Sequence, residues 1–193
     1  LALVTILFML GPIIISLLTP ILLHERFRFV HIVIACSGFI GAYIILRPAL
    51  SKFDVQMLLP VVSAFFYAMV SILSRKLGRT DSATSIAVNG SILIMTILLL
   101  FTVDEWTQLD SSDVVPLVVL VISGGVSSYI YIVACHLAPL PLIAPIDYTL
   151  VLLAALWGFL FWEEVPSNRF WIGGSFILAA AVGTSISAWR FRQ

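Results

Sequence analysis

A carboxyl side chain lies inside one of the most apolar stretches of this chain. Asp147 stands within residues 140–151, the run Leu-Pro-Leu-Ile-Ala-Pro-Ile-Asp-Tyr-Thr-Leu-Val. Placing a charged carboxylate near the centre of a bilayer costs roughly 2.5 to 3.5 kcal/mol on insertion scales, so such a residue usually faces a partner, a cavity or a solute path. Asp147 is therefore the leading candidate for holding a cationic group or a coupling proton.

Polar and aromatic side chains in other apolar runs are suited to complete a binding site around this carboxylate. Tyrosine, asparagine and histidine supply hydrogen bonds, and the aromatic rings also supply stacking faces. The candidate solute-binding residues are Asp147, Tyr148, Tyr67, Tyr131, Asn89 and His136. Tyr67 and Asn89 serve equally well as hydrogen-bond partners between helices. If Asp147 pairs with a neighbouring helix, we expect its partner to be Tyr67, Asn89 or His136.

Three prolines come just before the carboxylate, at positions 139, 141 and 145. Each lacks a backbone donor and leaves a carbonyl free to meet a solute or water. A loop followed by a helix start explains Pro139 and Pro141 equally well. Helical spacing then places small residues on the face of Asp147, a pattern that suits a cavity. These residues are Val151, Ala154 and Gly158.

Two further faces with helical spacing carry small residues. One is expected to pack against another helix, because small side chains let backbones approach closely. It consists of Ser175, Ala179, Gly183 and Ser187. The other either packs or lines a cavity, and consists of Gly124, Ser128, Tyr131 and Cys135.

The sequence lacks the usual motifs for catalysis or metal binding. The three histidines are scattered without an HExxH motif, the two cysteines have no CxxC spacing, and no GxSxG motif is present. We therefore expect no catalytic residues, no metal and no cofactor. A membrane-embedded transferase would need clustered His, Asp or Ser at an interface, which the loops lack. A non-transporting structural subunit would tolerate an apolar residue at Asp147. Both remain alternatives to transport.

Composition indicates an all-α integral membrane protein. Of the residues, 61% are hydrophobic and 10% are charged, and the mean hydropathy is +1.14, values far from those of a soluble domain. Apolar runs long enough to span a bilayer predict a bundle of seven transmembrane helices at residues 1–23, 29–47, 56–74, 83–103, 114–135, 137–162 and 170–189. The balance of 10 basic and 10 acidic residues argues against nucleic acid as a partner.

The positions of the charges predict how the protein lies in the membrane. Seven of the ten basic residues fall in alternate connections: Arg26, Arg28, Arg75, Lys76, Arg79, Arg190 and Arg192. The opposite connection at residues 104–113 is acidic. The positive-inside rule then predicts a cytoplasmic C-terminus, and we expect a multi-pass protein of the cell (inner) membrane.

Two parts of the chain share a layout. One span ends at Glu25 and is followed by a span with Gly38 and Gly41, while a later span ends at Glu163 and Glu164 and is followed by a glycine-bearing span. The two copies are five spans apart, and an odd number of spans inverts the second copy. Inverted repeats are frequent in secondary transporters, with the solute site near the midplane between them.

The motifs in this order resemble the EamA family of the drug/metabolite transporter superfamily. Residues 12–48, with His24-Glu25-Arg26 and the run Gly38-Phe-Ile-Gly-Ala-Tyr-Ile-Ile-Leu-Arg-Pro48, resemble the close of its first repeat. Residues 74–82, the run 144–150 around Asp147 and Phe161-Trp-Glu-Glu-Val-Pro166 resemble its second repeat. Ile34 stands where the family often has Gly, and the usual Gly before the last Glu is replaced by Trp162 or Glu163.

The resemblance implies the last seven helices of a ten-helix inverted-repeat fold. Residues 1–48 would end the first repeat with two helices, and residues 56–189 would form the second with five. The chain begins with Leu1 in an apolar run, which fits the downstream part of a longer protein. The family implies a secondary transporter that works by alternating access on a small organic metabolite, such as an amino acid or a related compound. Its partners would be this small-molecule solute, the lipid bilayer and, as a further candidate, a second copy in a homodimer.

The predicted orientation can be tested with single cysteines. A cysteine at Gln108, in the acidic connection, should react with an impermeant thiol reagent added outside intact cells, whereas one at Thr80 should react only after the membrane is opened. The opposite labelling pattern would reverse the orientation.

Overall fold

The computed structural model describes residues 2–25, 28–46, 57–102, 110–163 and 165–191, and within these ranges the chain is helical without strands. Its helices are α1 (Ala2–Phe8), α2 (Gly11–Leu23), α3 (Phe29–Leu46), α4 (Leu58–Leu77), α5 (Ala83–Thr102), η3 (Ser111–Asp113), α6 (Val114–Leu137), α7 (Leu140–Ile143), η4 (Ala144–Tyr148), α8 (Thr149–Trp162) and α9 (Asn168–Phe191). The predicted features at Arg26, Arg47, Pro48, residues 104–109, Glu164 and Arg192 lie outside the described residues.

Seven helical stretches in the described ranges are long and apolar enough to cross a membrane, which confirms the predicted seven spans. Two of these stretches combine several elements. The span Leu3–Leu23 contains α1 and α2, and the span Leu140–Phe161 contains α7, η4 and α8. The others fall within α3, α4, α5, α6 and α9.

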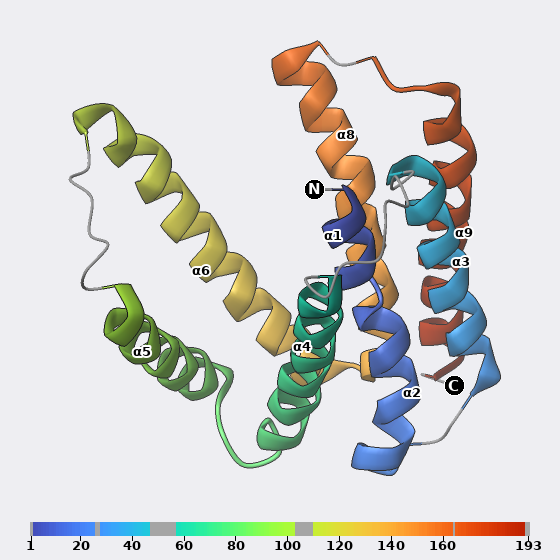
Figure 1. The fold of residues 1–193 in the computed structure, drawn as a ribbon. Coiled ribbons are helices and arrows are strands. Elements are labelled where there is room, and N and C mark those ends of the chain that lie inside the picture. Colours follow the sequence, from blue (N-terminus) through green and yellow to red (C-terminus); the bar gives the residue numbers. More distant parts are fainter. Residues whose placement is uncertain (1, 26–27, 47–56, 103–109, 164, 192–193) are drawn as a thin grey trace. The chain divides into compact units, whose positions relative to one another are not determined.

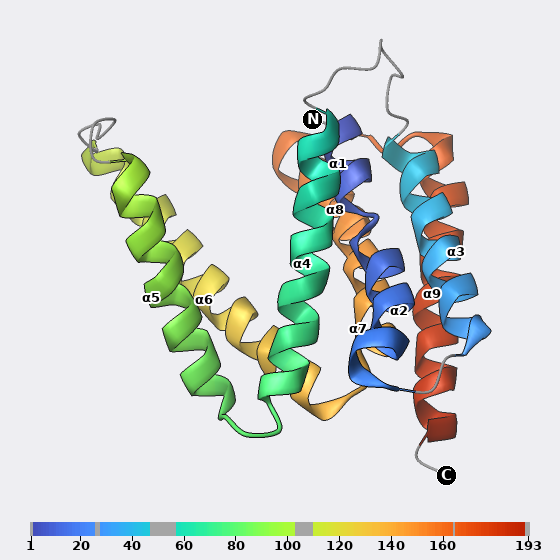
Figure 2. The same ribbon diagram turned by 60° about the horizontal axis from the view of Figure 1, so that its bottom comes forward.

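The chain forms two compact units. Unit 1 comprises Leu1–Leu73 and Ala138–Gln193, and unit 2 comprises Ser74–Leu137. In unit 2, α5 and α6 run side by side in opposite directions (Figure 2). The Nη1 atom of Arg75, near the end of α4, donates hydrogen bonds to the carbonyls of Cys135 at 3.0 Å and His136 at 2.6 Å. These carbonyls lie in the last turn of α6, where the helix itself provides no donors.

Unit 1 contains two helical hairpins with matching backbone features. In the first, α2 ends at Leu23 and His24 adopts a left-handed conformation (φ 54°). In the second, α8 ends at Trp162 and Glu163 adopts the same conformation (φ 56°). In Figure 1, α2 and α8 run in opposite directions, and so do α3 and α9. The two hairpins are therefore inverted relative to each other, as an inverted repeat requires.

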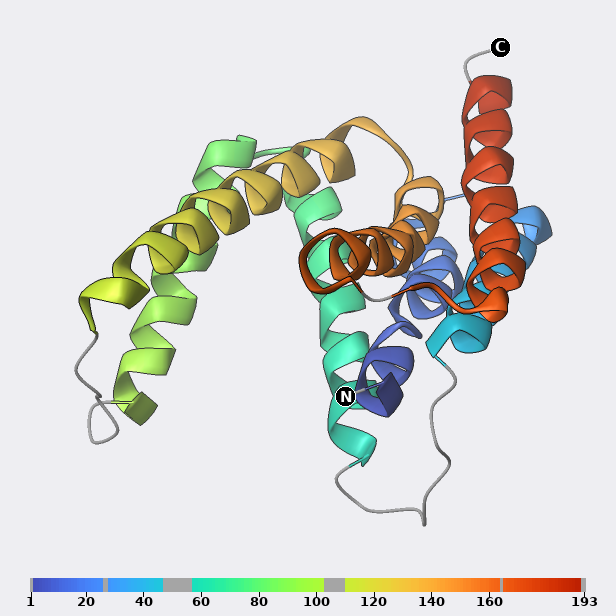
Figure 3. The same cartoon turned by 90° about the horizontal axis from the view of Figure 1, so that it is seen from above.

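The second helix of each hairpin packs against its counterpart, so that α3 and α9 lie side by side (Figure 3). A Cβ atom added to Gly41 would lie 2.5 Å from the carbonyl oxygen of Gly173, and one added to Gly173 would lie 2.5 Å from that of Gly41. The two backbones approach this closely because neither residue has a side chain. Ser37 adds a hydrogen bond across the pair, from its Oγ to the carbonyl of Phe176 at 3.2 Å.

The face of α9 that packs differs from the predicted one. Gly173, Ile177, Ala180 and Thr184 are buried, whereas Ser175 and Ala179 of the predicted face are exposed. Gly183 is half-buried and Ser187 is buried. Residues spaced by four drift around a helix by about 40° per step, because a turn contains 3.6 residues. The predicted face therefore turns towards the neighbouring helix only at its C-terminal end.

The core of unit 1 draws on both hairpins and on the two composite spans. It is a cluster of buried side chains from α1, the residues after it, α3, η4, α8 and α9. Its members are Ile6, Met9, Ala42, Tyr148, Val151 and Ile177. The residues next to Asp147 are thus fixed from several directions.

Two adjacent glycines provide a matched test of the α3–α9 contact. Gly173→Ala should lower the free energy of unfolding by about 1 to 3 kcal/mol, the usual cost of overpacking. Gly174→Ala should be neutral or slightly stabilising, because its Cβ would meet only a side-chain atom of Leu152 at 3.4 Å and alanine favours helix. Thermal unfolding of both purified variants measures the difference. Equal stability of the two variants would contradict the close approach.

Candidate functional site around Asp147

Asp147 lies where its membrane span changes from one helical form to another. It belongs to η4, a 3₁₀ turn between α7 and α8. Pro139 caps α7, and Pro141 and Pro145 stand in the first turns of α7 and η4, positions where a missing N–H is not needed. All three prolines therefore start helical segments, although the sequence offered this interpretation only for Pro139 and Pro141.

A second span of unit 1 is interrupted as well. Between α1 and α2, Met9 and Leu10 form a turn, and the carbonyl of Leu10 accepts hydrogen bonds from the N–H groups of both Ile13 and Ile14. Met9 lies 15 residues before the left-handed residue His24, and Tyr148 lies 15 residues before the left-handed residue Glu163. Met9 and Tyr148 are 139 residues apart. The interruptions therefore occupy corresponding positions of the two hairpins.

Tyr67 on α4 connects the two interruptions. Its hydroxyl donates a hydrogen bond to Oδ2 of Asp147 at 2.7 Å. Its ring packs beside Phe8 with the ring centroids 5.6 Å apart, and a Cβ atom added to Gly11 would lie 3.1 Å from its Cδ1. Of the three partners that the sequence suggested for Asp147, the structure provides Tyr67.

The carboxylate of Asp147 keeps the capacity to bind another donor. A phenol bonded to a carboxylate forms a strong, charge-assisted hydrogen bond, which offsets part of the cost of burial. Within the described residues, Tyr67 is the one side chain that hydrogen-bonds Asp147. Because an ionised carboxylate has about four acceptor positions, N–H or O–H groups of a solute can bind beside Tyr67 or in its place.

Tyr148 is adjacent to Asp147 in sequence but occupies a different environment. Its side chain is fully buried, and its hydroxyl donates a hydrogen bond to the carbonyl of Met9 at 3.2 Å. Its ring covers Gly38 so closely that a Cβ atom there would overlap it. In this structure the phenol thus contacts the other interruption and the core.

The remaining predicted site residues belong to unit 2. Asn89 is exposed on α5, and its amide donates to Oγ of Ser85 one turn earlier. Tyr131 is half-buried on α6. The ring of His136 packs on Gly78, and within the described residues its buried Nε2 has no hydrogen-bond partner. The structure therefore brings Tyr67 to Asp147 and places Tyr148 in the core, and solute contact by all six residues stays a prediction.

The sequence suggested a cavity lining for two small-residue faces, with packing as the alternative for the face on α6, and in the structure each face has both buried and exposed residues. Val151 is buried in the core while Ala154, on the same predicted face, is exposed. On α6, Cys135 is buried while Gly124 is exposed, and a Cβ atom at Gly124 would meet nothing within 4 Å. Neither face forms a continuous cavity wall within the described residues of its own unit.

Three residues of the site were not predicted. Phe8, Met9 and Gly11 lie on the interruption that contacts Tyr67 and Tyr148. The available signal was Gly11-Pro12 in an apolar run, since Gly followed by Pro marks a break in regular structure.

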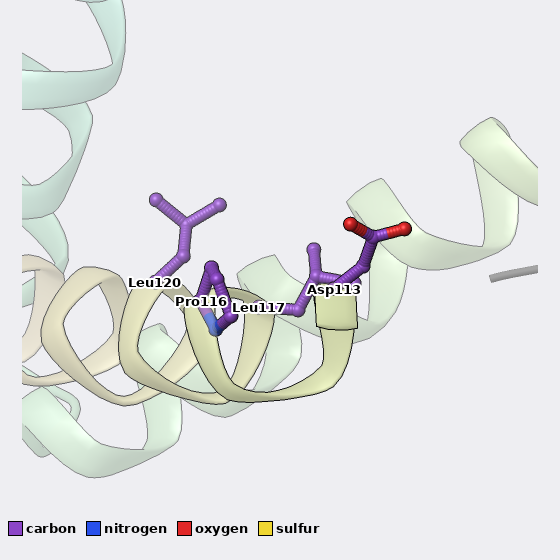
Figure 4. Close-up of a pocket in the computed structure, with 4 residues that line it drawn as sticks. All are labelled: Asp113, Pro116, Leu117 and Leu120. Atoms are coloured by element: carbon purple, nitrogen blue, oxygen red, sulfur yellow. The ribbon is translucent and has the colours of Figure 1, made fainter. Parts of the chain in front are cut away.

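A shallow hollow in unit 2 offers a poorer site. It is lined by Asp113, Pro116, Leu117 and Leu120, and Figure 4 shows the carboxylate of Asp113 directed away from Leu120. Three of these four side chains are apolar, so the hollow provides few groups for recognising a polar solute.

Comparison with known proteins agrees with the resemblance seen in the sequence. Residues 55–186 match the model of the EamA-like transporter family. A riboflavin transporter of Vibrio cholerae is 30% identical over 97% of this chain and 62% of its own length. A riboflavin transporter of Brucella anthropi is 25% identical, over 93% of this chain and 65% of its own length. An S-adenosylmethionine uptake transporter of Rickettsia prowazekii is 23% identical, over 89% of this chain and 58% of its own length.

A solved structure confirms the fold. One crystal structure superposes on this chain with a TM-score of 0.83 at 21% sequence identity. The superposition covers the whole of this chain and 69% of the chain in that crystal structure. The chain spans less than two thirds of the length of the three relatives named above. The matched family model covers more than half of the chain, and the seven apolar helices fit a membrane protein. The chain therefore belongs to the EamA-like transporter family and is a multi-pass membrane protein.

Proposed function

We propose that this protein is a secondary transporter that moves a small organic metabolite across the cytoplasmic (inner) membrane by alternating access. The observation that carries the proposal is the hydrogen bond from Tyr67 to Asp147, formed where two interrupted spans meet. Discontinuous helices near the midplane are a recurring way to build solute sites in secondary transporters. Membership in a transporter family supports transport over catalysis.

The chemistry of the site favours a cargo with a planar ring and N–H donors. Phe8 and Tyr67 offer aromatic faces and Asp147 accepts hydrogen bonds, a combination that binds flat heteroaromatic or cationic groups. Relatives are named as transporters of riboflavin and of S-adenosylmethionine, and both compounds contain a planar heteroaromatic system with N–H groups. An amino acid or a related compound, as expected from the sequence, would place its ammonium group on Asp147.

The same proposal includes the two repeats, the remaining predicted site residues, the orientation in the membrane and the homodimer. Residues 1–48 are assigned to the end of one repeat and residues 56–189 to the other, which the 139-residue spacing of the two hairpins supports. Tyr131, Asn89 and His136 stay proposed solute-binding residues. A cytoplasmic C-terminus and a homodimer complete the proposed arrangement.

Asp147→Asn tests the proposal because it keeps the side-chain volume and removes the charge and the exchangeable carboxyl proton. Transport should fall roughly tenfold or more, as expected for the loss of charged hydrogen bonds. Membrane insertion should stay near normal. Flux of radiolabelled riboflavin and S-adenosylmethionine is measured in both directions, in vesicles that hold the full-length protein.

Asp113→Asn is the matched control, since it removes an exposed carboxyl group in unit 2 and should leave flux unchanged. Wild-type flux of both compounds through the Asp147→Asn variant would reject the role of the carboxylate. Loss of folded protein together with flux would indicate a structural role instead.

A further inference from the structure

The 3₁₀ turn that carries Asp147 depends on contacts outside its own span. Pro145 has no N–H group, so one of the backbone hydrogen bonds that would continue α7 into the turn Ala144–Tyr148 is missing. Backbone hydrogen bonds hold both ends of the turn, because the N–H of Ala144 donates to the carbonyl of Leu140 and the N–H of Thr149 donates to the carbonyls of Asp147 and Ile146. Backbone bonds do not set the direction of a side chain, so groups from other elements orient that of Asp147, as Tyr67 does through its hydrogen bond.

Tyr148 supplies such a contact. It is fully buried, its ring covers Gly38 on α3, and its hydroxyl bonds the carbonyl of Met9 at 3.2 Å. The α1–α2 turn leaves backbone carbonyls outside a regular helix ladder, and a buried carbonyl needs a donor. One side chain thus satisfies a carbonyl of the first interruption and anchors the second.

Tyr67 touches the same two interruptions from another side. Its ring lies against Phe8 and Gly11, which flank Met9, and its hydroxyl reaches Asp147, which precedes Tyr148. Tyr148 and Tyr67 thus each join the two interruptions, Tyr148 through its hydrogen bond to Met9 and Tyr67 through its contacts with residues of both.

We propose that Tyr148 is a positioning residue for the solute site, and that its hydrogen bond to the carbonyl of Met9 holds Asp147 within reach of Tyr67. The proposal rests on the function proposed above and assigns Tyr148 a role different from the direct solute contact expected from the sequence. Tyr148 acts on the solute through Asp147.

The first test is a double-mutant cycle in the full-length protein, assayed with riboflavin and S-adenosylmethionine as probes. Tyr148→Phe removes only the hydroxyl, and should raise KM about five- to tenfold with little change in the maximal rate, the factor expected for one lost hydrogen bond. In a Tyr67→Phe background the same change should have little further effect, because the contact it positions is already absent. Tyr43→Phe, which removes the same atom from a more exposed site on α3, is the control.

If Tyr148→Phe raises KM by the same factor with and without Tyr67→Phe, the two side chains act independently. This result would overturn the proposal and favour direct solute contact by Tyr148. An unchanged KM in Tyr148→Phe would overturn it as well. If Asp147→Asn abolishes flux while Tyr148→Phe has no effect, the proposed function stands and the positioning role fails. If Asp147→Asn retains wild-type flux, the proposed function itself fails.

The second test requires no transported probe. Dicyclohexylcarbodiimide modifies carboxyl groups in apolar surroundings, and its addition to Asp147 is followed by mass spectrometry. Tyr148→Phe should speed this modification about threefold or more, because the carboxyl group loses its fixed partner, while Tyr43→Phe should not. Gly38→Ala displaces the Tyr148 ring but keeps its hydroxyl, and should speed the modification as Tyr148→Phe does. This variant replaces Tyr148→Phe in the test if Tyr148→Phe folds poorly. Wild-type rates in both variants would refute the positioning role.

Discussion

A carboxyl group within a membrane span constrains the rest of unit 1. Hydrocarbon provides no water for its oxygens, so the protein must supply donors or lose stability. Tyr67 supplies one at 2.7 Å, and it can do so only because α4 lies beside both interrupted spans. Under the positioning role that we propose for Tyr148, its burial and the two interruptions keep Asp147 near this phenol.

Two hairpins with matching backbone features form the surroundings of Asp147 in unit 1. Each hairpin has a left-handed residue at the end of its first helix, His24 in one and Glu163 in the other, and an interruption 15 residues before it. Gly41 and Gly173 let the second helices approach closely, which brings the first helices and their interruptions together. The inverted arrangement thereby places both helix interruptions next to the carboxylate. A solute that binds there would contact both interruptions, as in secondary transporters with discontinuous helices.

The sequence predicted what depends on composition and on short-range chemistry. The seven spans follow from hydropathy, and Asp147 with Tyr67 follows from the cost of polar groups in an apolar span. The contact face of α9 was predicted only in part, since Gly183 meets Ile34 whereas Ser175 and Ala179 are exposed. Small residues show that a helix can pack closely but not on which side. The hydrogen bond that buried Tyr148 makes to Met9 joins residues 139 positions apart, and no local pattern encodes such a contact.

The central claim is that a transported solute binds at Asp147, where the two interrupted spans meet. An experimental structure of the full-length protein with riboflavin or S-adenosylmethionine bound tests it most directly. We predict that a donor group of the solute lies within hydrogen-bond distance of the Asp147 carboxylate and that its ring lies against Phe8 or Tyr67. A solute bound elsewhere, with the hydrogen bond between Tyr67 and Asp147 intact, would contradict the claim.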